Sequence, residues 1–167
     1  MAGDNVQSIA MQPDFYDEFR LRVDGRKVLI LGVGNRSRGD DGLGSYLADR
    51  LKGKLNVPLL DAGSVPENFL RQVEASQADL VLVLDTADLR AAPGDVALLE
   101  LSQVSDMAIS THTVNLQLLF KVIPASRRPK VLVLAVQPET TVDGTKMSLT
   151  ARLAMQGLES LLRGMFS

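Results

Sequence analysis

Three segments of the chain are apolar at almost every position, and they constrain the fold more than any other feature. The segments are Lys27–Gly34 (KVLILGVG), Asp79–Asp85 (DLVLVLD) and Lys130–Val136 (KVLVLAV). A strand with one solvated face alternates polar and apolar residues, whereas a strand buried on both faces is apolar throughout. These segments therefore predict central strands of a mostly parallel sheet that is covered by helices on both faces.

The intervals between these strands predict two further strands and five helices. The strands are expected over Asn56–Asp61 and over Gly94–Leu101, the latter as an antiparallel edge strand. Helices are expected over Pro13–Val23, Asp41–Leu51, Thr113–Ile123 and Leu149–Met165, and after a capping-box pattern that begins at Ser64. In the last helix, six apolar side chains are expected to face inward: Leu149, Leu153, Leu158, Leu161, Leu162 and Met165. The alternation predicts one α/β domain, which 167 residues can fill.

The composition narrows the possible chemistry. The chain has no cysteine, one histidine (His112) and a formal net charge of −2. Disulfides, thiolate nucleophiles and thiolate metal sites are therefore excluded, and no excess of basic residues indicates nucleic-acid or membrane binding. The first residues do not resemble a secretory signal, and no apolar run approaches the ~20 residues that span a bilayer. We therefore expect a cytoplasmic protein.

Acidic residues follow three of the predicted strands. Asp40 and Asp41 follow the first strand, Asp61 ends the second and Asp85 ends the third, while His112 begins a later helix. Sites in such sheets form at the carboxyl ends of the strands, so these side chains are expected along one edge. Asp40 is expected to cap the helix that follows it, and Asp61 to form an Asx turn.

Asp41, Asp85 and His112 form a candidate metal site. Two carboxylates and one neutral imidazole suit a divalent metal that keeps open positions for water or substrate. The positive end of the helix after Ser110-Thr111 is expected to lower the pKa of His112 and keep its ring neutral, as metal binding requires. A metal there could polarise a carbonyl or supply hydroxide. An aspartic dyad of Asp41 and Asp85 is an alternative, but it leaves His112 unexplained.

The stretch LGVGNRSRGDDGLG, from Leu31 to Gly44, supports a different function, the binding of a nucleotide. Its first glycines resemble the turn of a dinucleotide-binding domain, and Asp61 resembles the ribose-binding acid of that fold. The GxGxxG fingerprint, however, needs glycine at position 37, where the chain has Ser37. Asp40 and Asp41 also oppose a pyrophosphate at the helix N-terminus. A Rossmann-like nucleotide-binding module therefore stays as the alternative, and no GxSxG or Walker A motif adds a third enzyme class.

Several motifs together resemble one known family. They are Gly32-Val33-Gly34-Asn35, Asp40-Asp41-Gly42, Leu60-Asp61-Ala62-Gly63-Ser64, the strand that ends in Asp85, Ser110-Thr111-His112-Thr113 and Val136-Gln137-Pro138-Glu139. With them the chain resembles the [NiFe]-hydrogenase maturation endopeptidases from about residue 27 to 163, and most closely the branch that serves hydrogenase-3 type enzymes. It departs from that family in a longer N-terminal extension, and in Ala62 and Ser64 where glycine and threonine are common.

The resemblance implies a fold and an activity. The fold is a three-layer α/β/α sandwich of the phosphorylase/hydrolase-like type, with a twisted, mostly parallel sheet of five strands over residues 27–167 and an extension over residues 1–26. The activity is that of a metal-dependent or aspartyl endopeptidase, which removes the C-terminal extension of the hydrogenase large-subunit precursor after nickel insertion. The family's metal ligands match Asp41, Asp85 and His112, which would grip nickel brought by the precursor.

The resemblance also implies what else the protein needs. No organic cofactor is expected, and we expect a monomer whose partner is the precursor. A chaperone that checks nickel loading without cutting the precursor is a further alternative.

Overall fold

The computed structural model describes residues 6–7, 13–107 and 112–167. In these ranges the strands are β1 (Val6–Gln7), β2 (Val28–Val33), β3 (Leu59–Gly63), β4 (Leu80–Thr86), β5 (Val96–Glu100) and β6 (Lys130–Val136). They form one sheet in the order β1-β5-β6-β4-β2-β3. The four strands β3, β2, β4 and β6 run parallel, while β5 is antiparallel to β6 and β1 is antiparallel to β5.

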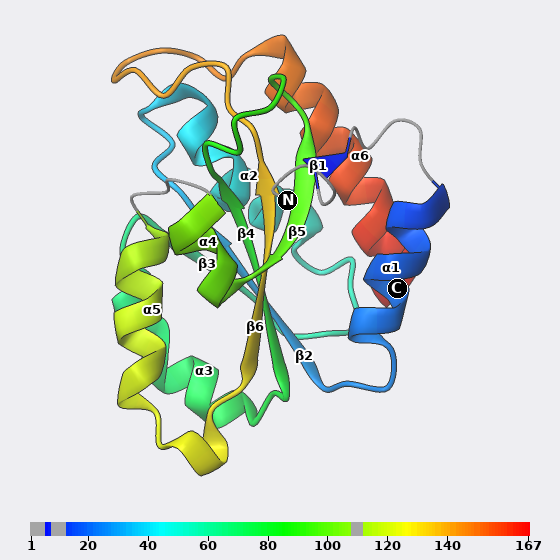
Figure 1. The fold of residues 1–167 in the computed structure, drawn as a ribbon, viewed down its shortest axis with the longest axis vertical. Coiled ribbons are helices and arrows are strands. Elements are labelled where there is room, and N and C mark those ends of the chain that lie inside the picture. Colours follow the sequence, from blue (N-terminus) through cyan, green and yellow to red (C-terminus); the bar gives the residue numbers. More distant parts are fainter. Residues whose placement is uncertain (1–5, 8–12, 108–111) are drawn as a thin grey trace.

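Helices cover both faces of the sheet, as Figure 1 shows. The α-helices are α1 (Pro13–Val23), α2 (Leu43–Leu51), α3 (Leu70–Ser76), α4 (Leu101–Met107), α5 (Thr113–Val122) and α6 (Leu149–Phe166), and the 3₁₀ turns are η1 (Gly39–Gly42), η2 (Pro66–Phe69) and η3 (Ala125–Arg127). Helices α1, α2 and α6 pack on one face, and α3, α4 and α5 pack on the other. Among the described residues, no helix is both long enough and apolar enough to cross a membrane.

The apolar strands supply both layers of the core. In β4, Leu80, Leu82 and Leu84 pack with α1, α2 and α6. Val81 and Val83 alternate with them and pack with α3, α4 and α5. All five side chains are fully buried. The structure therefore confirms the prediction that a strand with no polar face lies between two layers of helices.

The five predicted strands and the mostly parallel sheet are confirmed, but the sheet has one more strand than predicted. The additional strand, β1, belongs to the N-terminal extension, and its Val6 pairs with Ala97 of β5. Two residues of pairing carry no hydrophobic periodicity, so no sequence pattern indicated them. Helix α1 of the same extension was predicted, and its Phe15, Phe19 and Val23 are buried.

Two local predictions differ from the structure. Ser64 does not cap a helix, because η2 begins at Pro66 with Val65 before it and no side-chain capping bond. Leu149 and Leu153 do not face inward, since they are 61% and 57% exposed. Leu158 and Leu162 are buried as predicted, and the buried stripe of α6 also includes Ala151, Ala154 and Met155.

Helix α4 was not predicted from the sequence. Its residues, LSQVSDM, include serine, valine and aspartate, which are poor helix formers. The side chain of Gln103 accepts a hydrogen bond from the backbone N–H of Glu100 at 2.8 Å, just before the helix. This contact is local, whereas the fully buried Val104 packs the helix against the core. Propensity alone did not reveal the helix, because that packing depends on residues distant in sequence.

The turn from β2 into α2 depends on glycine at two positions. A Cβ at Gly44, in the first turn of α2, would collide with the backbone oxygens of Val33 and Leu84 at the ends of β2 and β4. A Cβ at Gly34, whose φ is +152°, would collide with the backbone oxygen of Asp41. Because both positions lack a side chain, α2 and η1 lie directly over the strand ends. This packing fixes the position of Asp41.

We expect Gly44→Ala to destabilise the protein by about 3 kcal/mol, because neither backbone carbonyl can move away cheaply from the new methyl group. Gly164→Ala is the matched control, since a Cβ at this position in α6 meets no atom within 4 Å. The control is expected to gain about 0.5–1 kcal/mol from higher helix propensity. Urea unfolding measures both values, and equal stability of the two variants would contradict the close approach of α2 to the sheet.

Candidate functional site

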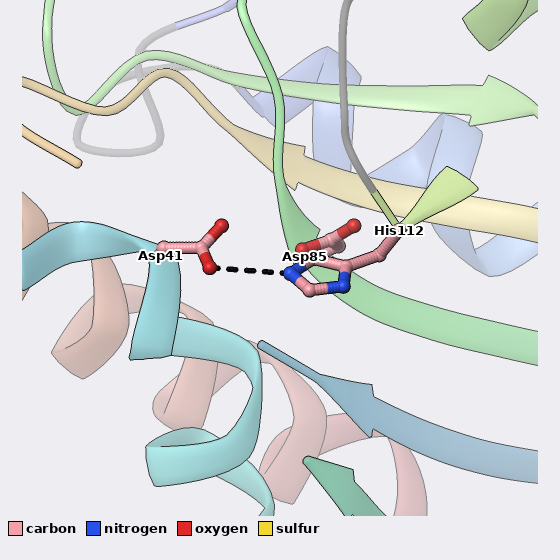
Figure 2. A group of neighbouring side chains, drawn as sticks. All are labelled: Asp41, Asp85 and His112. Atoms are coloured by element: carbon pink, nitrogen blue, oxygen red, sulfur yellow. Dashed lines mark hydrogen bonds and ion pairs between the residues drawn. The ribbon is translucent and has the colours of Figure 1, made fainter. Parts of the chain in front are cut away.

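Three ionisable side chains from separate elements meet at one edge of the sheet. Asp41 lies on η1, Asp85 lies in β4, and His112 directly precedes α5. Each offers one possible metal-ligand atom, and these atoms all lie within 4.8 Å of one another. The exposed fractions are 6%, 0% and 9%. Figure 2 shows the three side chains pointing toward a common centre.

The location follows from the strand order. The chain passes from β2 to β3 on one side and then returns past β2 to β4 on the other side. A crevice forms at the carboxyl ends of neighbouring parallel strands where the connections diverge in this way. Asp41 follows β2 and Asp85 lies near the end of β4, so both acids stand at this switch point. The structure thus brings together the three residues that the sequence singled out.

Short hydrogen bonds orient the three side chains. Nε2 of His112 lies 3.1 Å from Oδ2 of Asp41, and this contact is drawn as a dashed line in Figure 2. The backbone N–H of Asn35 donates to the same oxygen at 3.2 Å. The N–H of Thr86 donates to Oδ1 of Asp85 at 2.8 Å. The backbone of the neighbouring strand ends therefore holds both carboxylates in position.

Asp41 and His112 shift each other's pKa. Burial raises the pKa of Asp41, but the hydrogen bond and charge of His112 outweigh it and lower the pKa below its usual value. The hydrogen bond to Asp41 raises the pKa of His112; burial opposes this rise, and the charge of Asp85 adds to it. The prediction that the helix end lowers the pKa of His112 is therefore wrong, because two facing carboxylates outweigh it. Ser110 and Thr111, on which that prediction also rested, lie outside the described residues.

The donor set fits a divalent metal ion. Carboxylate oxygen and imidazole nitrogen together suit first-row metals such as nickel and zinc. Two ligands that each lie about 2.1 Å from one ion are at most about 4.2 Å apart, so atoms within 4.8 Å need to converge only slightly. The arrangement can therefore bind one metal through three protein ligands, which leaves positions for a substrate.

Asp40 has a different structural role from the predicted helix cap. Its fully buried carboxylate accepts hydrogen bonds from the backbone N–H groups of Glu139, Thr140 and Ser148, and from Oγ of Ser148, at 2.7–3.2 Å. The same Oγ caps α6 by accepting from the N–H of Ala151. Asp40 therefore ties η1 to the loop over residues 139–148. The sequence did not indicate this role, because the partners lie about 100 residues away.

Asp61 and Asp88 lie outside the cluster. Asp61 forms the predicted Asx turn by accepting from the N–H of Gly63 at 3.1 Å, and it also forms an ion pair with Arg36 at 3.0 Å. Asp88 is exposed and accepts from the N–H of Arg90. In the glycine turn, the N–H of Asn35 is already bonded to Asp41 rather than free for a phosphate. These contacts favour a metal site over a nucleotide site.

Arg38 is a further charged residue near the cluster that the sequence did not single out. Its positive charge helps to lower the pKa of Asp41 and opposes the rise in the pKa of His112. Its side chain is only partly exposed. Arg38 therefore adds a positive charge to the electrostatic environment of the candidate ligands.

Comparison with known proteins connects the chain to one family. A family model described as hydrogenase maturation protease matches residues 42–162. The hydrogenase 3 maturation protease of Escherichia coli K12 is 29% identical over 114 residues, which cover 66% of this chain and 72% of that protein.

Solved structures share the fold of this chain. A maturation protease from Thermococcus kodakarensis KOD1 superposes with a TM-score of 0.76 at 22% identity, covering 89% of this chain and 97% of that one. The solution structure of the Escherichia coli endopeptidase HycI gives a TM-score of 0.70 at 24% identity, covering 83% and 90%.

We expect Asp40→Asn to destabilise the protein by about 2–3 kcal/mol, because an amide cannot accept all four hydrogen bonds and its NH₂ group would face backbone donors. Asp88→Asn is the control, since this exposed side chain accepts one local bond and its change is expected to stay within about 0.5 kcal/mol. Urea unfolding compares the two variants. Equal losses would show that Asp40 does not anchor the loop.

The chain has a single histidine, so NMR can follow His112 without ambiguity. In metal-free protein we expect a pKa above 6.5, because Asp41 and Asp85 favour the protonated ring. Because the pKa of His112 is higher in the folded state than in the unfolded state, protonation of the ring stabilises the fold. This contribution is fully present at pH values below the unfolded-state pKa and is lost as the pH rises through the folded-state pKa. Asp41→Asn should lower the pKa of His112, because burial then acts with less opposition. An unchanged titration in that variant would refute the coupling.

Proposed function

Because the chain belongs to the hydrogenase maturation protease family, we propose that it is an endopeptidase that removes the C-terminal extension of a nickel–iron hydrogenase large-subunit precursor after nickel insertion. The observation that supports this most is the convergence of Asp41, Asp85 and His112, whose ligand atoms lie within 4.8 Å of one another. Three buried ligands from three elements provide a site for a metal that arrives with a bulky substrate.

In this proposal the nickel belongs to the precursor, and the chain contributes the remaining ligands. Asp41 and Asp85 supply carboxylate oxygens, and His112 supplies a ring nitrogen. His112 must lose its ring proton before it can ligate, so binding is expected to release a proton. A precursor without nickel has no metal for these three side chains to coordinate. Nickel loading and recognition are thereby linked, and no organic cofactor is needed.

The reaction is hydrolysis of one peptide bond. A divalent metal beside that bond supplies a Lewis acid that polarises the carbonyl or activates a water molecule. Water adds to the carbonyl carbon, the C–N bond breaks, and the leaving amine takes up a proton. In this proposal, the carboxylate of Asp41 or Asp85 accepts the proton from the water and returns it to the amine. The backbone N–H groups of Asn35 and Thr86 keep these carboxylates in position.

We expect His112→Ala and Asp85→Asn to lower the cleavage rate of nickel-loaded precursor by at least about 100-fold, because each removes a proposed metal ligand. Asp88→Asn, which changes an exposed acid outside the cluster, should cleave at the normal rate. Intact mass spectrometry of the precursor over time measures the shortened product. Full processing of the precursor by the His112→Ala variant would contradict the assignment of His112 as a metal ligand.

Nickel-free precursor provides the second arm of this experiment. The proposal requires that it stays uncut under conditions in which the loaded form is processed. Equal cleavage of both forms would contradict recognition through nickel. A stable complex without any shortened product would instead identify a chaperone that checks nickel loading. Binding of NAD(P) by calorimetry would favour the nucleotide-binding alternative.

A further inference from the structure

Basic side chains occur on two segments that lie side by side, the turn before η1 and the loop before α6. Arg38 is in the first segment, two residues before Asp40. The backbone bonds from Gly144 N to Ser37 O (2.8 Å) and from Gly39 N to Thr145 O (3.1 Å) hold the segment of Arg38 against the loop that precedes α6. The one basic residue of that loop, Lys146, therefore directly follows a residue bonded to the segment of Arg38, although it lies over 100 residues away in sequence.

A cavity of about 340 Å³ lies between α2, α6 and the loop before α6. Its apolar lining comes from Tyr46, Met147 and Met155, and its basic lining comes from Arg36, Lys146 and Arg152. Arg36 directly follows Asn35, whose N–H binds Asp41. Arg36, which lines the cavity, is therefore the sequence neighbour of a residue that orients a proposed metal ligand.

The basic side chains of the cavity differ in whether nearby acidic side chains neutralise their charge. Arg36 stacks on Tyr46 at 4.5 Å and forms ion pairs with Asp61 at 3.0 Å and Asp49 at 3.7 Å. Within the described part of the chain, the side chains of Lys146 and Arg152 form no hydrogen bond or ion pair. Both are exposed. Arg36 is therefore largely structural, whereas Lys146 and Arg152 leave a net positive rim.

Two acidic residues of the same loop do not remove this positive charge. Glu139 is hydrogen bonded to Thr150, and the exposed Asp143 stands on the turn of the loop. Neither residue lines the cavity. An apolar floor with two unpaired cations at its rim fits a ligand that combines apolar groups with carboxylates.

We propose that Arg38 and the cavity rimmed by Lys146 and Arg152 bind an acidic segment of the precursor polypeptide next to the scissile bond; this inference rests on the proposed function. The location favours a polypeptide, because a chain whose scissile bond lies at Asp41 extends its neighbouring residues past Asn35 and Arg36. Aliphatic parts of that segment contact Met147 and Met155, and its carboxylates face Lys146 and Arg152. The surface selects the precursor by charge, separately from the metal.

The test is the double charge reversal Lys146→Glu with Arg152→Glu, measured on nickel-loaded precursor. At low salt, KM is expected to rise by about tenfold or more while kcat stays within about twofold, because the change weakens docking and leaves the metal ligands intact. At about 0.5 M salt the difference should shrink, since exposed charges are then screened. Arg163→Glu is the matched control, because it reverses an exposed charge at the far end of α6.

Direct binding keeps this inference separate from the proposed function. Biolayer interferometry with the immobilised precursor measures docking even if no cleavage occurs. His112→Ala should still dock through the basic surface but not cut, so its normal cleavage would count against the catalytic assignment alone. An unchanged Kd and KM in the double variant, or equal losses in Arg163→Glu, would overturn the docking surface. Binding of inorganic phosphate or NAD that is lost in the double variant, with precursor binding unchanged, would also overturn it.

Discussion

The close approach of α2 to the ends of β2 and β4 is the constraint on which the site depends. At Gly44 the helix meets the backbone oxygens of Val33 and Leu84 with no room for a side chain. Because η1 is continuous with that helix, its Asp41 reaches the edge where β4 presents Asp85. A larger residue would lift the helix, and the two carboxylates would separate. Packing of backbone against backbone therefore sets the geometry of ligands that belong to different elements.

The two adjacent aspartates of η1, Asp40 and Asp41, have different structural roles. Asp40 turns into the structure, where it is satisfied by four donors from residues 139–148. Asp41 turns toward His112 and the strand ends. Each acid has its own donors, so two neighbouring carboxylates are buried without sharing one site. The first acid fixes the short segment that carries the second, so Asp40 anchors the segment and Asp41 remains the proposed ligand.

Much of the fold could be predicted because the core strands carry an unusually clear signal. The segment Leu80–Leu84 has no polar face, and this alone required helices on both sides of the sheet. Asp85 could be identified because it is a charged residue at the end of an otherwise apolar strand. His112 could be identified because it is the only histidine in the sequence. The role of Asp40 and the strand β1 could not be predicted, because both depend on partners distant in sequence. The pKa of His112 was mispredicted because only the helix end was considered, although the sequence had already placed Asp41 and Asp85 at the same edge of the sheet.

Charge balance links the buried cluster to the nature of its proposed substrate. Asp41, Asp85 and His112 bring two acids and one imidazole together in a region where each residue is at most 9% exposed. Arg38 adds a positive charge that acts on two of them, because it helps to lower the pKa of Asp41 and opposes the rise in the pKa of His112. A divalent ion with a neutral imidazole would cancel both carboxylates. Burial therefore disfavours the cluster without a metal, and a divalent ion would relieve this cost. Under the proposed function, the same desolvation that makes the three residues costly to bury would favour a metal-loaded precursor over a metal-free one.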